Sequence, residues 1–160
     1  MDIAFKEVIR NIVDTMIPAH KLLGITLVEI SAGRAILAMP YKAELVGDPR
    51  SNRLHGGLLS ALLDSAGGAA AITTLTGPDD MVSSIDMRTD YLEPGRPELV
   101  HAEAEIVRSG STILVTNMKA WHPESGVVIA EARGVYRVRR KEKDQTGMDP
   151  NTFDLPDSAG

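Results

Sequence analysis

The stretch from Arg53 to Gly68 reads RLHGGLLSALLDSAGG, and the apolar helix that it predicts decides the fold. Between Arg53 and Asp79 the only acidic or basic residue, histidine aside, is Asp64. A carboxylate in a segment of Leu, Ala, Gly, Ser, Thr and Ile is costly to bury without a partner. We therefore expect an apolar helix over residues 56–75, buried on all sides, in which Asp64 has either a partner or a chemical role.

The spacing of Gly57 and Asp64 adds a geometric constraint. Seven residues separate them, which places both on one face of the helix. At about 1.5 Å per residue they are roughly 10 Å apart along the axis, so one reacting carbonyl cannot contact both. A helix N-terminus stabilises negative charge, so the backbone at Gly57 can act on a substrate as well as the carboxylate of Asp64. If both serve one reaction, the acid must come from a second copy, which predicts a symmetric dimer with two sites across its interface.

The remaining patterns predict an antiparallel sheet around this helix. Residues 2–17 have the spacing of an amphipathic helix, which Pro18 ends, and residues 41–54 form a polar connection. Short separators make the last three predicted strands antiparallel neighbours. The pattern alone therefore gives an α+β fold. Strands are expected over residues 24–30, 35–39, 82–92, 99–108, 112–121 and 127–139.

Length, charge and composition limit the function classes. The 160 residues suffice for one domain, expected over residues 1–140, with residues 1–17 as its N-terminal helix and residues 141–160 as a flexible tail. A net charge of −5 disfavours nucleic-acid binding. The sequence has no cysteine, no basic leader and no uncharged apolar stretch of membrane-spanning length. We expect a cytoplasmic protein that binds neither nucleic acid nor membrane.

Two motifs, taken in order, resemble a known family. His55-Gly56-Gly57, a leucine-rich helix and an acid eight residues after the first glycine are similar to the hotdog-fold acyl-CoA thioesterases, in particular the phenylacetate-pathway type. The run SIDMRTDYLEP at residues 84–94 resembles that family's strand after the helix. The likeness covers about residues 18–140. It implies a hotdog fold, an antiparallel β-sheet wrapped around a long central α-helix, and hydrolysis of an acyl-CoA to the free acid and CoA.

The resemblance also implies roles for the motif residues. Asp64 would be the nucleophile, or the general base that activates water. Gly56 matches the oxyanion-hole donor, with Gly57 beside it against the substrate. His55 would contact the substrate or hold the loop, and Ser84 would orient the water or the acid. Each has a structural alternative: a paired acid at a dimer interface, glycines where backbones crowd, a loop histidine and an ordinary strand serine.

Further residues are candidates for substrate binding. Many relatives carry Asn where this chain has Asp48, and an ionised carboxylate cannot donate a hydrogen bond, so Asn52 is the alternative amide. The CoA phosphates require basic groups, for which we expect Arg88, Arg108 and Arg137. The alternative for each arginine is a solvated strand face.

The expected assembly is a homodimer with sites at its interface, extended to a homotetramer. No metal or other cofactor is expected, because CoA is part of the substrate and the four histidines lack metal-ligand spacing. Dinucleotide-binding, P-loop and nucleophile-elbow motifs are missing from the sequence. The main alternative is a non-catalytic, regulatory acyl-CoA-binding module, which would not need the acid. The acyl group is not predicted, although the small residues at positions 66–69 leave room beside the helix.

Overall fold

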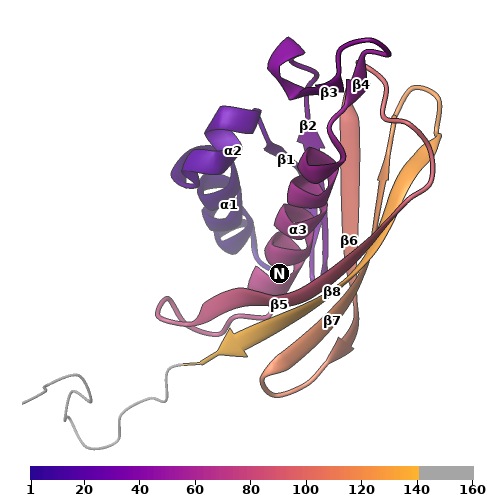
Figure 1. The fold of residues 1–160 in the computed structure, drawn as a ribbon. Coiled ribbons are helices and arrows are strands. Elements are labelled where there is room, and N and C mark those ends of the chain that lie inside the picture. The colour runs from indigo at the N-terminus through magenta and orange to yellow at the C-terminus, as the bar shows by residue number, and fades with distance from the viewer. Residues whose placement is uncertain (141–160) are drawn as a thin grey trace, which may run out of the picture.

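A single curved sheet surrounds one long helix in this protein (Figure 1). The computed structural model describes residues 1–140, and the predicted tail at residues 141–160 lies outside that range. The helix is α3 (Gly56–Ile72). The α+β hotdog fold expected from the sequence is confirmed. In spatial order the six antiparallel strands are β1 (Thr26–Ser31), β2 (Arg34–Met39), β6 (Val100–Ser109), β7 (Ile113–Trp121), β8 (Val128–Arg139) and β5 (Met81–Tyr91).

The strand order combines local and long-range pairing. As predicted, β6, β7 and β8 are antiparallel neighbours joined by short connections. By contrast, β5 follows α3 in the sequence but pairs with β8, the last strand, and so forms one edge of the sheet. The polar connection at residues 41–54 contains a short 3-10 helix and a two-stranded ribbon that lead into α3. These are Ala43–Leu45, β3 (Val46–Asp48) and β4 (Arg53–Leu54).

Small side chains on the sheet allow α3 to approach it closely. Leu62, Leu63 and Ala66 of the helix are fully buried. They share one hydrophobic cluster with alanines of the central strands, among them Ala102 and Ala120. Full burial of a leucine side chain contributes about 1.5–3 kcal/mol, so this contact is a main source of stability.

Two predictions about α3 need correction. The helix ends at Ile72 rather than at residue 75. It is also not buried on all sides in the single chain: Gly57 is exposed, and Asp64 and Gly68 are half-buried. The reason is that its second flank faces the edge strand β5 and a cavity instead of the middle of the sheet.

The N-terminal segment is more divided than predicted. The helix expected over residues 2–17 is α1 (Ile3–Asn11), which continues as a π-helical turn at Ile12–Met16. Pro18 does not only end this helix; it also begins α2 (Pro18–Leu23). Proline suits the first helical position because its missing N–H would have no partner there. Gly24 then ends α2 in the left-handed conformation at φ 76°.

Candidate active site

The side chain of Asp64 is held in one orientation by two hydroxyl groups. Ser84 of β5 donates a hydrogen bond to Asp64 Oδ1 at 2.7 Å. The Tyr136 hydroxyl of β8 lies 3.1 Å from the same Oδ1 and 3.1 Å from the backbone carbonyl of Asp64. Within residues 1–140, no donor is bonded to Oδ2. The carboxylate is therefore fixed through one oxygen, which leaves the other available to a substrate or to water.

The chain makes specific room for Tyr136. Its ring is fully buried, and a Cβ at Gly67 of α3 would overlap the phenol hydroxyl. A Cβ at Gly134 would lie 2.8 Å from the ring. Burial raises the pKa of the Tyr136 phenol, and the charge of Asp64 raises it further. The phenol therefore stays protonated and acts as a hydrogen-bond donor to the carboxylate.

Ser84 faces α3 because of an irregularity in β5. The register between β5 and β8 shifts between Ser84 and Asp86, so Ile85 is an extra residue with no partner across the ladder. Ser84 lies opposite Tyr136, and both side chains reach Asp64. Of the adjacent pair Ser83 and Ser84, the structure thus brings the second to the acid.

The start of α3 presents backbone donors at the other end of the candidate site. His55 is the N-cap residue, and its Nδ1 accepts a hydrogen bond from the Gly57 N–H at 3.0 Å. The Gly56 N–H lies in the first turn, where N–H groups have no intrahelical acceptor. No hydrogen bond from Gly56 N–H to another residue is present in the described range 1–140. His55 therefore orders the helix start, while the Gly56 N–H remains able to bind an oxyanion.

Tyr91, at the end of β5, was not predicted as a site residue. Its hydroxyl lies 2.6 Å from Ser60 Oγ and 3.1 Å from the Gly56 carbonyl, to which it donates. A Cβ at Gly56 would be 3.1 Å from the Tyr91 ring. The ring therefore covers the helix start, which gives a packing reason for glycine there. The run DYLEP carried no local signal for this contact because it depends on the long-range pairing of β5.

Asp48 is the last residue of β3 and Asn52 lies in the turn after it, and neither is hydrogen-bonded to Asp64 within residues 1–140. Asp48 accepts hydrogen bonds from Ser51 Oγ at 2.8 Å and from the Arg50 backbone N–H at 3.1 Å. The hydrogen bond from Ser51, followed by those from Arg50, lowers the pKa of Asp48. Asp48 is therefore ionised, and its carboxylate stabilises the turn that follows it. Asn52 adopts the left-handed conformation at φ 50°, and its Oδ1 accepts a hydrogen bond of 3.4 Å from Tyr41.

The three predicted CoA-binding arginines are not gathered around Asp64. Arg88 of β5 lies opposite Arg133 of β8 in the sheet. It forms an ion pair of 3.0 Å with Asp90. Arg108 lines a separate groove of about 380 Å³ at the turn between β6 and β7. Arg137 is exposed opposite Ser83. Arg88 and Arg137 alternate with inward residues, and Arg108 lies opposite Val115 beyond an irregularity at Val107, so all three face away from α3.

A cavity of about 210 Å³ lies beside Asp64. One wall is α3 and the opposite wall is the N-terminal segment. His20 of that segment is buried, and its ring nitrogens are 3.0 Å from the Val13 carbonyl and 2.9 Å from Ser65 Oγ. A Cβ at Gly68 would have no atom within 4 Å, so this glycine faces open space. The room expected beside the small residues of the helix is present here.

Metal-binding groups and membrane-spanning helices are both missing from the described residues 1–140. Residues 1–140 contain no group of three His, Asp or Glu side chains placed to hold a metal ion. Within these residues none of the helices has the length and apolar character needed to cross a bilayer.

Comparison with known proteins gives consistent matches. Residues 51–129 match the sequence profile of the thioesterase superfamily. The medium/long-chain acyl-CoA thioesterase YigI of Escherichia coli is 32% identical over 133 residues, which are 76% of this chain and 85% of YigI. Human acyl-coenzyme A thioesterase 13 is 28% identical over 130 residues, 78% of this chain and 90% of that enzyme.

Solved structures share the fold. A thioesterase family protein from Silicibacter pomeroyi is 27% identical with a TM-score of 0.76, covering 86% of this chain and 99% of that one. The PaaI protein of the Escherichia coli phenylacetic acid degradation operon is 22% identical with a TM-score of 0.67, covering 74% of this chain and 82% of PaaI. At that identity the likeness to PaaI concerns the fold.

Proposed function

This chain belongs to the thioesterase superfamily and is an acyl-CoA thioesterase, and from that premise we propose how its residues hydrolyse the thioester. The observation on which the proposal rests is the orientation of Asp64, whose Oδ1 accepts bonds from Ser84 and Tyr136 while Oδ2 has no donor within residues 1–140 and the residue lines a cavity. One fixed and one available oxygen suit a group that acts on a substrate.

Two routes are open to Asp64. As a general base, Oδ2 takes a proton from water, the hydroxide attacks the thioester carbonyl, and CoA leaves as a thiolate that is then protonated. As a nucleophile, Oδ2 attacks the carbonyl itself and expels the thiolate, and water then hydrolyses the acyl anhydride. In either route negative charge develops on the carbonyl oxygen, where the Gly56 N–H would stabilise it. Neither route needs a metal or redox cofactor.

Asp64 and Gly56 of one chain cannot serve the same carbonyl. Eight residues of helix separate them, which corresponds to about 12 Å along the axis. The expected homodimer removes this difficulty, because the Gly56 N–H of one copy can complete a site around the Asp64 of the other. Each dimer would then have two equivalent sites.

The edge strand β5 supplies a specific geometry for that dimer. In the pairing of β5 with β8, three residues of β5 define this geometry: Ser84 lies opposite Tyr136, Arg88 opposite Arg133 and Tyr91 opposite Ala130. Ser84 and Tyr91 are therefore three positions to either side of Arg88 (136 − 133 and 133 − 130). If two β5 strands pair antiparallel around a two-fold axis at Arg88, each Ser84 lies opposite the Tyr91 of the other copy. Since Ser84 contacts Asp64 and Tyr91 contacts Gly56, this register brings the two halves of the site together.

A cysteine at position 88 tests this register. Across the axis the two Cα atoms would be about 4.5–5.5 Å apart, within the range of a disulfide. Because the chain has no cysteine, Arg88→Cys is expected to form a covalent dimer on mild oxidation, seen on a non-reducing gel. Arg133→Cys, one strand further from the axis on the same face, would place the two thiols about 14 Å apart and should not cross-link. Equal cross-linking of both variants, or a monomer by light scattering, would contradict the proposed dimer.

Measuring repeated turnover distinguishes a thioesterase from the alternative, a non-catalytic module that only binds acyl-CoA. We expect release of free thiol from acyl-CoA over many turnovers, measured with a thiol reagent across a panel of acyl groups. A module that only binds would retain acyl-CoA and release no thiol.

The homotetramer and the cytoplasmic location stay predictions. Light scattering on the wild-type chain distinguishes a dimer from a tetramer. The location is supported by the substrate, since acyl-CoA esters are made and used inside cells.

A further inference from the structure

We propose that the acyl chain of the substrate passes from Asp64 under the N-terminal helix, in a channel that accommodates medium to long fatty acyl groups. This inference rests on the proposed function and adds the course of the acyl chain. The 210 Å³ cavity at Asp64 is bounded on the far side by Ile72 and Val82. The same two residues line a second groove, of about 920 Å³, between α1 and the end of α3. The two spaces are therefore adjacent, and the proposed path runs from the first to the second past these two side chains.

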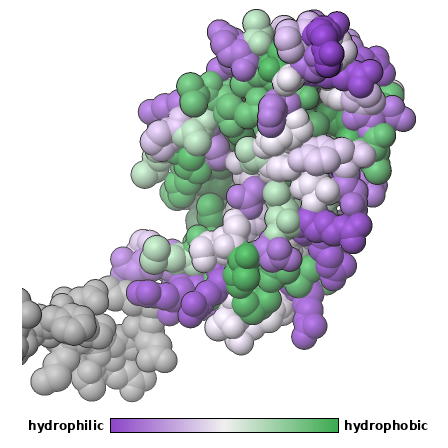
Figure 2. Space-filling model, viewed as in Figure 1, coloured by the Kyte–Doolittle hydropathy of each residue, from purple (hydrophilic) through white to green (hydrophobic). Residues whose placement is uncertain are grey.

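The second groove is apolar where an occupant would contact it. Phe5 and Val8 of α1 and Ile12 of the π-helical turn line the groove. On the other side are Ile72, the last residue of α3, and Leu75. Phe5 and Leu75 are half-buried, and Val8 is 52% exposed, which is high for a valine beside a cavity. Hydrophobic surface gathers over α1 in Figure 2, and the outline of the molecule is hollowed between α1 and β5. Contiguous apolar surface of this kind indicates a site that is covered during function.

Several polar groups of the groove are already hydrogen-bonded within the chain. Thr73 Oγ1 accepts from the Gly33 N–H at 2.8 Å and donates to the Ala70 carbonyl at 2.6 Å. Asp80 Oδ2 accepts from the Thr76 N–H at 2.8 Å. Asp2 Oδ1 accepts from the Phe5 N–H at 2.7 Å and so caps α1. A polar ligand would find few partners here, whereas a hydrocarbon chain needs none.

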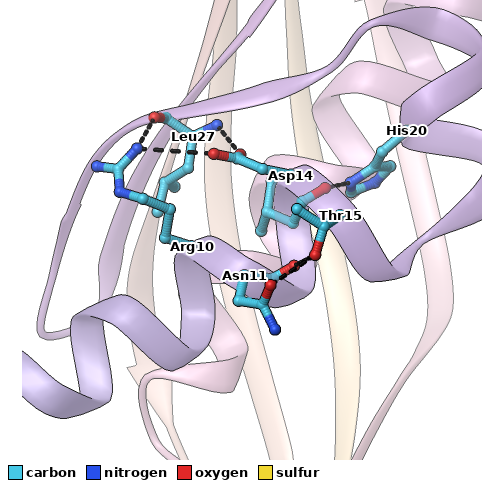
Figure 3. A network of polar contacts seen from close by, with 7 residues as sticks. Arg10, Asn11, Asp14, Thr15, His20 and Leu27 are labelled. Carbon is cyan, nitrogen blue, oxygen red and sulfur yellow. Dashed lines mark hydrogen bonds and ion pairs between the residues drawn. The ribbon is translucent and has the colours of Figure 1, made fainter.

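The wall formed by the N-terminal segment is fixed to the sheet (Figure 3). Asp14 Oδ1 accepts a hydrogen bond of 2.7 Å from the Leu27 N–H of β1, and Arg10 donates one of 2.8 Å to the Leu27 carbonyl. His20, which lines the cavity at Asp64, is held at the Val13 carbonyl of the π-helical turn. The hydrogen bond of His20 to Ser65 Oγ at 2.9 Å joins the same segment to α3, so this wall is tied to both the sheet and the helix.

The size of the two spaces determines the chain length. In this proposal the cavity at Asp64 holds the first carbons of an acyl group next to the reacting carbonyl, and the adjacent groove beyond Ile72 and Val82 takes the rest. Each methylene that leaves water on binding contributes about 0.8 kcal/mol, equivalent to about fourfold in kcat/KM. Selectivity should therefore rise with chain length until the groove beneath α1 is filled.

A carboxylate in the groove tests the channel. We expect Val8→Asp to lower kcat/KM for dodecanoyl-CoA by about tenfold or more relative to butanoyl-CoA, since the charge opposes burial of the distal chain. Ile3→Asp is the matched control: it makes the same change on the same helix, at a residue that is 81% exposed and does not line the groove. It should keep the wild-type dependence on chain length. Both positions are exposed, so both variants are expected to fold.

A binding measurement makes the result independent of turnover. The dissociation constants of dodecanoyl-CoA and butanoyl-CoA are measured by calorimetry for Asp64→Asn, alone and combined with Val8→Asp or Ile3→Asp. Length-dependent binding that only Val8→Asp weakens supports the channel, even if wild-type hydrolysis were absent and the proposed function failed. Equal affinity for both esters, or equal effects of the two Asp substitutions, would overturn the channel while leaving the thioesterase proposal intact.

Discussion

Asp64→Asn is expected to reduce kcat for acyl-CoA hydrolysis at least about 100-fold, the low end of what general-base catalysis supplies. The amide is nearly isosteric and can act neither as base nor as nucleophile. Its Oδ1 can still accept the hydrogen bonds from Ser84 and Tyr136, so the fold and substrate binding should persist. Thiol release measures the rate, and thermal unfolding with calorimetric binding of an acyl-CoA checks that the variant is intact.

Asp48→Asn is the matched control for this substitution. It makes the same change at the end of β3, where Asp48 is bonded to Ser51 and Arg50 of the turn that follows. It also introduces the residue that the family resemblance implies at this position, so activity should be unchanged or improved. If Asp64→Asn kept wild-type turnover while Asp48→Asn lost it, the acid that acts on the thioester would be on β3 and not on α3.

Local periodicity was enough to predict the elements that form the core. The apolar run around Leu62 predicted α3, and period-two alternation predicted strands within one or two residues of β6, β7 and β8. Short separators fixed the antiparallel order of those three strands. The resemblance then identified the hotdog fold. These features succeed because each depends on neighbouring residues alone.

The features that were missed depend on contacts between distant residues. Tyr136 reaches Asp64 across 72 positions of sequence, and nothing in its own alternating strand marks that contact. The pairing of β5 with β8 places Tyr91 over the start of α3, which no local pattern shows. Pro18 was interpreted only as the end of a helix, although the same restricted φ suits the start of the next one.

Whether Arg88, Arg108 and Arg137 bind the CoA phosphates stays a prediction. They were chosen because CoA carries phosphates, and their strand pairing points them away from α3. Within residues 1–140 of one chain they therefore do not complete a site with Asp64. The arrangement proposed for the dimer gives Arg88 a different place, on the two-fold axis.

A mixture of two inactive variants is expected to recover activity, because each site is proposed to use both chains. Gly56→Pro removes the N–H donor at the first helical position, where proline is tolerated, and should lower kcat about 100- to 1,000-fold. Gly56→Ala is the control, because it retains the N–H and has the same Cβ contact with Tyr91. A difference in kcat between the two variants therefore reports the loss of the donor and not the steric contact. Asp64→Asn lacks the acid instead. Each variant alone should be nearly inactive.

In a heterodimer of Gly56→Pro with Asp64→Asn, one site receives both lesions and the other receives none. Random association makes half of the dimers heterodimers, each with one of its two sites intact, so the mixture should recover about a quarter of wild-type activity. If Gly56 and Asp64 of the same chain formed a site, every site in the mixture would contain one lesion and no activity would return. Co-expression with two different affinity tags yields the heterodimer in pure form, where thiol release should reach about half of the wild-type rate per dimer. A pure heterodimer as inactive as its parents would show that the two halves of the site are not exchanged between chains.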